Sequence, residues 1–152
     1  MSNGSSTTVY VHDVASREEL HVFRLPENRS VNHLCLSSDG RRVAAIGDPD
    51  QVIVWDVDKA QELMRRTDEH GHVGSIAFSP DGRWLVIVGD SLTAWDVATG
   101  QRVFGVPDHQ KGMYRARFSP DGRGLVVWGR DEARFWGIVV SGGQPLEKPK
   151  QP

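Results

Sequence analysis

The segment Val73-Gly-Ser-Ile-Ala-Phe-Ser-Pro-Asp-Gly-Arg-Trp-Leu-Val-Ile-Val-Gly89 decides how this chain folds. Its first apolar run ends in Ser79-Pro-Asp-Gly82, where proline presets a turn, aspartate can bond back to the backbone and glycine accepts the left-handed conformation. The second run is rich in β-branched and aromatic side chains, which favours a strand that is covered on both faces. The segment therefore predicts two antiparallel strands joined by a tight turn.

Two more strands are predicted directly downstream. Gly89-Asp-Ser91 forms a second turn before the run Leu92-Thr-Ala-Trp-Asp96, and Ala98-Thr-Gly100 forms a third turn before Gln101-Arg-Val-Phe104. No window of the sequence shows sustained helical periodicity. Four antiparallel strands in about 40 residues make one compact all-β unit.

The unit is repeated along the chain. The turn aspartates Asp39, Asp81 and Asp121 are separated by 42 and 40 positions, read directly from the numbering. Tryptophans follow at matching places, 40 and 41 positions apart, at Trp55, Trp95 and Trp136. A partial fourth copy opens the chain at residues 9–14, with a histidine in the tryptophan position. A repeat of this length must be recognised first, because it determines the whole architecture.

With Trp55-Asp56 and Trp95-Asp96 at the third strand, the chain resembles the WD40-repeat family over roughly residues 8–138. Gly71-His72 also matches the Gly-His dipeptide of that family. The resemblance implies an all-β fold of β-propeller blades, each with four antiparallel strands, arranged as an incomplete ring or open arc. The expected divisions are a disordered start at 1–7, a partial blade at 8–28, blades at 29–70, 71–110 and 111–138, and a poorly structured tail at 139–152; an extension of the last blade to 147 is left open.

The resemblance also implies structural roles for particular residues. In the family, a histidine, an aspartate before the third strand and the tryptophan form a buried hydrogen-bonded network, which corresponds here to His72, Asp90 and Trp95. Trp55 and Trp136 occupy the same slot as Trp95 in the flanking blades. Those blades depart from the pattern, because Ser30 and Gly112 stand at the histidine position.

Too few blades are present to close a ring, since propellers close with about four to eight. Two explanations stay open: the sequence is a fragment of a larger propeller protein, or two copies complete one ring. In either case the terminal blades leave apolar faces uncovered, which predicts self-association or dependence on missing blades.

Catalytic and metal chemistry find little support in the sequence. The pair His70 and His72 has no third ligand at a suitable spacing, Ser38, Ser79 and Ser119 are expected in turns, and the single Cys35 lies in an apolar run. The expectation is therefore no enzyme, no catalytic residue, no metal and no cofactor. The formal net charge of −2 argues against nucleic acid or an anionic membrane as the main partner. No signal peptide or apolar membrane span is recognisable, which favours a cytoplasmic protein.

Binding is expected where the loops before the first strands and the loops between second and third strands meet at one end of the blades. Loops on a rigid scaffold often carry function. The candidate partner-binding residues at this end are Asn32, His33, Asp50, Ser75, Ser91, Tyr114, Arg115 and Arg130. The sequence therefore predicts a non-catalytic WD40-repeat scaffold for protein–protein interaction. The alternative is a small-molecule-binding or catalytic propeller with a ligand at the central channel.

Overall fold

A computed structural model describes residues 7–25, 30–47, 51–67, 72–106 and 113–137. These residues form strands and turns and contain no helix, so no described segment is a helix able to cross a membrane. The strands are β1 (Thr8–His12), β2 (Glu19–Arg24), β3 (Val31–Leu36), β4 (Arg42–Gly47), β5 (Gln51–Asp56), β6 (Gln61–Thr67), β7 (Val73–Phe78), β8 (Trp84–Gly89), β9 (Leu92–Asp96), β10 (Arg102–Val106), β11 (Met113–Phe118), β12 (Gly124–Gly129) and β13 (Ala133–Gly137).

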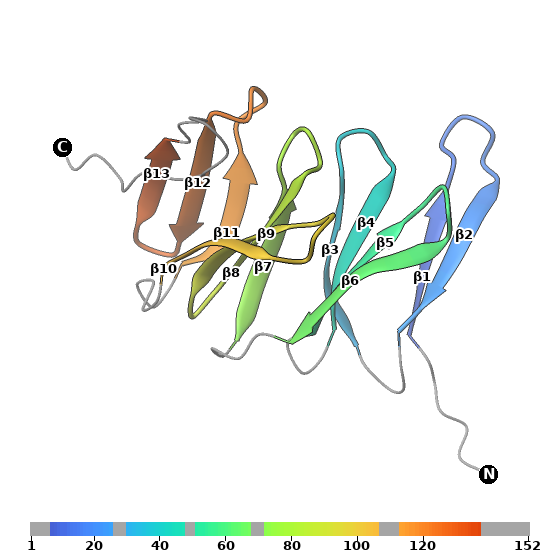
Figure 1. Ribbon diagram of the computed structural model, residues 1–152, viewed down its shortest axis with the longest axis horizontal. Coiled ribbons are helices and arrows are strands. Elements are labelled where there is room, and N and C mark those ends of the chain that lie inside the picture. Colours follow the sequence, from blue (N-terminus) through green and yellow to red (C-terminus); the bar gives the residue numbers. More distant parts are fainter. Residues whose placement is uncertain (1–6, 26–29, 48–50, 68–71, 107–112, 138–152) are drawn as a thin grey trace, which may run out of the picture.

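The strands form four antiparallel sheets that stand side by side in a row (Figure 1). Two sheets have four strands, β3–β6 and β7–β10, and they are flanked by the pair β1–β2 and by the described three-stranded sheet β11–β13. The first strands β3, β7 and β11 are neighbours in space, so they line one edge of the row. The described sheets do not close into a ring (Figure 1). The all-β, WD40-like fold in an open arrangement is confirmed.

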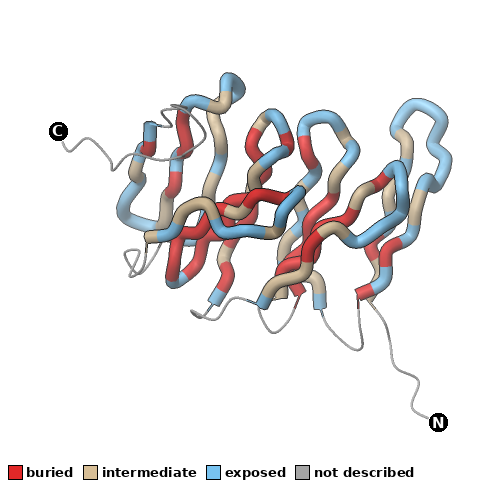
Figure 2. Tube along the Cα trace, in the orientation of Figure 1, coloured by how far each residue is buried: buried red, intermediate tan, exposed pale blue. Residues whose placement is uncertain are grey.

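An apolar core fills each gap between neighbouring sheets. Val9 and Phe23 of the β1–β2 pair pack against the next sheet, where Trp55 lies with its ring centroid 5.3 Å from that of Phe23. A second cluster joins β3–β6 to β7–β10, and a third joins β7–β10 to β11–β13. Figure 2 shows the burial concentrated in the strands at the middle of the row. Most of the apolar area is therefore removed from water between sheets, which is the main source of stability in stacked repeats.

The turn between first and second strands has the same hydrogen bonds in three sheets. The Ser37 hydroxyl donates to Asp39 at 2.6 Å and accepts from the amide of Arg42, while Asp39 accepts from the amide of Arg41. Gly40 adopts a φ of 72°. The same bonds are made at Ser79–Trp84 and at Ser119–Gly124. The expected turns are therefore present.

Ser38 lies in the turn as predicted, but the serine whose hydroxyl makes the turn hydrogen bonds is the residue before it. Ser37, and not Ser38, is the serine equivalent to Ser79 and Ser119. Ser37 directly follows the first strand, and its hydroxyl reaches both ends of the turn. Ser38 occupies the place that Pro80 has in the next sheet.

The aspartate after the third strand organises a second kind of turn. The Asp96 carboxylate accepts from the amides of Ala98 and Thr99, each at 3.0 Å, and Asp13 accepts from the two equivalent amides. Four residues beyond each aspartate the backbone has a positive φ, at Arg17, Ala60 and Gly100. The aspartate of the Trp-Asp pair is therefore a turn residue, which explains its recurrence without any role in chemistry.

The expected divisions at the chain ends, 1–7 and 139–152, lie outside the described residues except for Thr7, as does an extension of the last sheet to 147.

Candidate functional site

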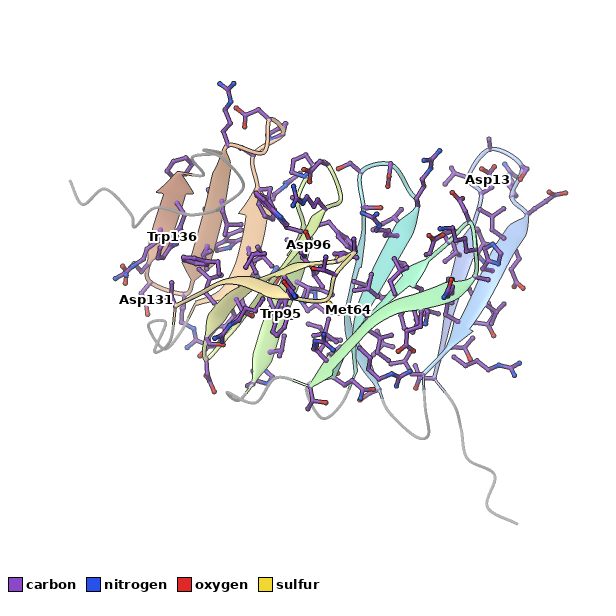
Figure 3. The ribbon with its side chains drawn as sticks, viewed as in Figure 1. Asp13, Met64, Trp95, Asp96, Asp131 and Trp136 are labelled. Carbon is purple, nitrogen blue, oxygen red and sulfur yellow. The ribbon has the colours of Figure 1, made fainter. Side chains whose placement is uncertain are left out.

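The first strands begin and the second strands end at the same end of each of the three larger sheets. Val31 pairs with Gly47, Val73 with Gly89, and Met113 with Gly129. We call this the first-strand end; the Ser-x-Asp-Gly turns lie at the opposite end. Asp131, in the turn just beyond Gly129, is labelled in Figure 3 at the lower side of the last sheet. The common end that the repeat pattern predicts is present.

A β-bulge interrupts each first strand at its second residue. The register shifts between Val31 and His33, between Val73 and Ser75, and between Met113 and Arg115. The residues within the bulges are Asn32, Gly74 and Tyr114. A bulge re-aims the side chain that it carries, and Asn32 and Tyr114 are both exposed.

Glycine is required where backbones meet at this end. A Cβ on Gly74 would lie 3.0 Å from the Cβ and the carbonyl oxygen of Tyr114, so the glycine lets the bulge of the next sheet pack directly against it. A Cβ on Gly89 would lie on the carbonyl of His72. Gly74 therefore permits close contact between the middle sheet and Tyr114 of the next sheet, while Gly89 permits close contact within the middle sheet itself.

Four candidate residues are exposed at the first-strand end: Asn32, Tyr114, Arg115 and Arg130. His33 is partly buried. Asp50 lies outside the described residues. Gly74 and the Tyr114 backbone touch, so the bulges of two sheets meet here.

Two candidates are corrected, because Ser75 and Ser91 are buried. Ser75 pairs with Val88, whose side chain is part of the core facing β11–β13, so the two residues share the covered face of their sheet. Ser91 lies within a tight turn closed by its carbonyl accepting from the amide of Gly89. Among the described residues its hydroxyl has no hydrogen-bond partner. Neither side chain can contact a partner without local rearrangement.

The network implied for His72, Asp90 and Trp95 is arranged differently from expectation. Asp90 accepts from the backbone amide of His72 at 3.2 Å, and its own amide donates to the His72 carbonyl at 3.1 Å. Both residues are exposed. The indole of Trp95 donates to the hydroxyl of Thr93 at 3.1 Å, on the same strand. Thr93, which lies two residues before the tryptophan, was not recognised from the sequence.

The three repeat tryptophans lie between sheets. Trp136 is buried with its ring 6.0 Å from that of Phe104, and Trp55 stacks on Phe23. Trp95 packs against the core shared with the preceding sheet. Figure 3 shows Trp95 and Trp136 within the row of sheets. Each tryptophan therefore stabilises contact with the sheet before it. Trp84 and Trp128 do not occupy the repeat position of the other three tryptophans or a common position of their own, and both are partly buried.

Arginines add links between the sheets that the sequence pattern did not predict. The Arg66 guanidinium lies 5.4 Å from the centroid of the Trp95 ring and donates to the carbonyl of Gly100 at 2.7 Å. Arg42 donates to the carbonyl of Gly82 in the next sheet. These cation–π and hydrogen-bond contacts connect a strand of one sheet to a turn of the next sheet, between residues that are 34 and 40 positions apart in the chain.

The surrounding structure shifts the pKa of Cys35 and of Asp96. Burial raises the pKa of the Cys35 thiol to about 12, so this cysteine stays protonated and unreactive near neutral pH. Burial opposes ionisation of Asp96, but hydrogen bonds from Thr99 and Arg83 prevail and lower its pKa. In the described ranges no three histidine, cysteine or acidic side chains gather in a way that could hold a metal ion.

Comparison with known families gives one match. Residues 61–96 match the family described as WD domain, G-beta repeat. The matched segment runs from β6 through β9, so the sequence repeat begins one strand before the sheet β7–β10. The repeat therefore links this sheet covalently to the sheet β3–β6. No protein of curated function matches the chain. The chain carries a WD40 repeat, set in a row of WD40-like antiparallel sheets.

Proposed function

We propose that this protein is a non-catalytic interaction scaffold that binds a protein partner at the first-strand end. WD40 repeats are typically protein-interaction modules, and stacked sheets hold their end loops in fixed positions. The observation that carries the proposal is the exposure of Tyr114, Arg115 and Arg130 together at this end.

These three side chains are available to a partner. Arg115 and Arg130 make neither an ion pair nor a hydrogen bond within the described part of the chain. Tyrosine and arginine are the residue types that most often carry binding energy at protein interfaces. The backbone and Cβ of Tyr114 lie against Gly74 of the neighbouring sheet, which positions the start of this side chain before any partner arrives. Such preorganisation lowers the entropy cost of binding.

The test compares two sets of bound proteins. Full-length chain and the triple variant Tyr114→Ala, Arg115→Ala, Arg130→Ala would be used as bait in quantitative affinity capture, followed by calorimetry on each purified candidate. We expect at least one directly binding protein whose affinity falls about a hundredfold or more, as for loss of interface hot spots. The control is Arg123→Ala, an exposed arginine at the opposite end of the same sheet. Equal binding by the triple variant and the control would rule out the first-strand end as the binding surface.

A further inference from the structure

The last sheet has one face covered by its neighbour and one face turned away from the row. Ala116, Phe118, Leu125, Val127 and Trp136 pack into the core shared with β7–β10. Side chains alternate between the faces of a sheet, and the register aligns the remaining residues across its three strands. The outward face therefore consists of Arg115, Arg117, Val126, Trp128, Ala133 and Phe135.

This outward face differs in chemistry from the equivalent faces inside the row. At the same positions the middle sheet has Ser75, Ala77, Val86, Val88, Leu92 and Ala94, which carry no charge, and its apolar members pack against β11–β13. The preceding sheet has His33, Cys35, Ala44, Ile46, Val52 and Val54. Of these three sheets, over their described residues, the last is the one with two arginines on its first strand and large aromatic rings on the other two.

The two arginines determine what can cover this face. Within the described chain Arg115 and Arg117 have no acidic partner. Burying an unpaired charge against another apolar sheet is strongly unfavourable, whereas a carboxylate can pair with a guanidinium through two parallel hydrogen bonds. Beside them Phe135 is 62% exposed and Val126 is also exposed. A ligand for this face therefore needs carboxylates together with apolar side chains.

A second copy of the chain does not meet this requirement. Among the described sheets, the face of β1–β2 turned away from the row is also uncovered, and it carries Tyr10, Val22, Arg24 and the paired residues His12 and Glu19. It offers one carboxylate for two arginines, and stacking it there would add Arg24 to them, which is unfavourable.

We propose that the outward face of β11–β13 binds an acidic segment of a protein partner, in which carboxylates pair with Arg115 and Arg117 and apolar side chains cover Val126 and Phe135. A segment in extended conformation fits best, because alternation along a strand presents acidic and apolar side chains at regular spacing. This surface shares only Arg115 with the first-strand end and stands whether or not that end binds a partner.

The test uses synthetic peptides of alternating glutamate and valine, about ten residues long to match a strand, titrated into isotope-labelled full-length chain and followed by NMR. We expect saturable shifts in β11–β13 and an affinity that falls at least about tenfold in Arg117→Glu and in Phe135→Ser. A tenfold loss corresponds to about 1.4 kcal/mol. The affinity should also fall with added salt.

Matched controls make the result decisive. Arg123→Glu changes the net charge equally but lies in the turn at the opposite end, so binding should be nearly unchanged. A lysine–valine peptide should not bind, and Tyr114→Ala with Arg130→Ala should leave the peptide affinity intact even where it abolishes binding at the first-strand end.

Three results would overturn the proposal. The first is no binding, or equal binding of the lysine peptide. The second is an equal loss in Arg123→Glu and Arg117→Glu, which would mean unspecific attraction. The third is a dimer in sedimentation velocity that Phe135→Ser dissociates, which would assign the face to a second copy. Circular dichroism of each variant would verify that its sheets are retained.

Discussion

Strands β3 and β7 hold equivalent places in neighbouring sheets, yet their apolar side chains meet different surroundings. Leu34 and Leu36 of β3 are 50% and 56% exposed, whereas Ile76 and Phe78 at the same register of β7 are 4% and 9% exposed. Both strands pair with their own second strand in the same register. The difference therefore arises outside the sheet.

The cause is how much of each strand the preceding sheet covers. Strand β7 faces the four-stranded sheet β3–β6, while β3 faces the β1–β2 pair, which covers Trp55 and Val57 but not Leu34 or Leu36. The comparison teaches that the repeat sequence specifies a register, and that position in the row decides burial. Contacts made within one turn should not depend on that position.

The sharpest test of this comparison truncates one side chain in each strand. Ile76→Ala should reduce the free energy of unfolding by about 2–4 kcal/mol, because it opens a cavity in the core between two complete sheets. Leu34→Ala removes a side chain that is half in water and should cost less than about 1 kcal/mol. Urea denaturation followed by circular dichroism measures both. Equal losses would mean that Leu34 is covered in solution.

A smaller effect tests a contact that lies within one turn. Hydrogen bonds from Ser37 and the Arg41 amide lower the pKa of Asp39, so its charged form stabilises the fold above the unfolded pKa and this contribution is lost as pH falls through the folded pKa. Asp39→Asn should cost about 0.5–1 kcal/mol at pH 7, allowing for the exposure of the carboxylate. In urea titrations the difference from the unaltered chain should shrink progressively as the pH falls below the ordinary aspartate pKa of about 3.9. A difference that is independent of pH would contradict an ionic origin.

The smallest effect concerns the turns after the third strands. Ala60 has a φ of 50° where the equivalent Gly100 has 66°. Ala60→Gly should stabilise by about 0.5–1 kcal/mol, since release of left-handed strain exceeds the entropy that glycine adds to the unfolded chain. Ala98→Gly, in the equivalent turn without a positive φ, is the control and should be neutral or destabilising. A lower melting temperature for Ala60→Gly would show that no strain is stored there.

The repeat made most of the fold predictable. Turn residues and apolar runs located the strands of the middle sheet, because proline, aspartate and glycine have conformational preferences that act locally. Trp95-Asp96 then carried the resemblance to a WD40 repeat, and residues 61–96 match that repeat. The same local reasoning placed the first strands and the second-to-third turns at one end.

The candidate site was less predictable, because side-chain exposure depends on packing between repeats. Ser75 was chosen as a loop residue but lies on a strand face that a neighbour covers, and Ser91 lies within a tight turn. The outward face of the last sheet was missed, although comparing Arg117 with Ala77 at the same repeat position could have revealed it. Equally, the link from Arg66 to Gly100 requires a distance in space that no spacing in the sequence encodes.

The arrangement of the sheets in a single row has a consequence for how the molecule opens. Apart from the covalent linkers, the contacts of the described residues join each sheet to the sheets directly beside it, through an apolar core and a few hydrogen bonds such as Arg42 to Gly82. Such a row unfolds by nearest-neighbour steps, and an end sheet can detach while the remainder stays folded. We therefore expect backbone amides of β4, β5, β8 and β9 to exchange slowly with solvent and protection to decline toward the outer sheets of the row. A partner that binds either outer sheet would slow its detachment and would also stabilise sheets that it does not contact.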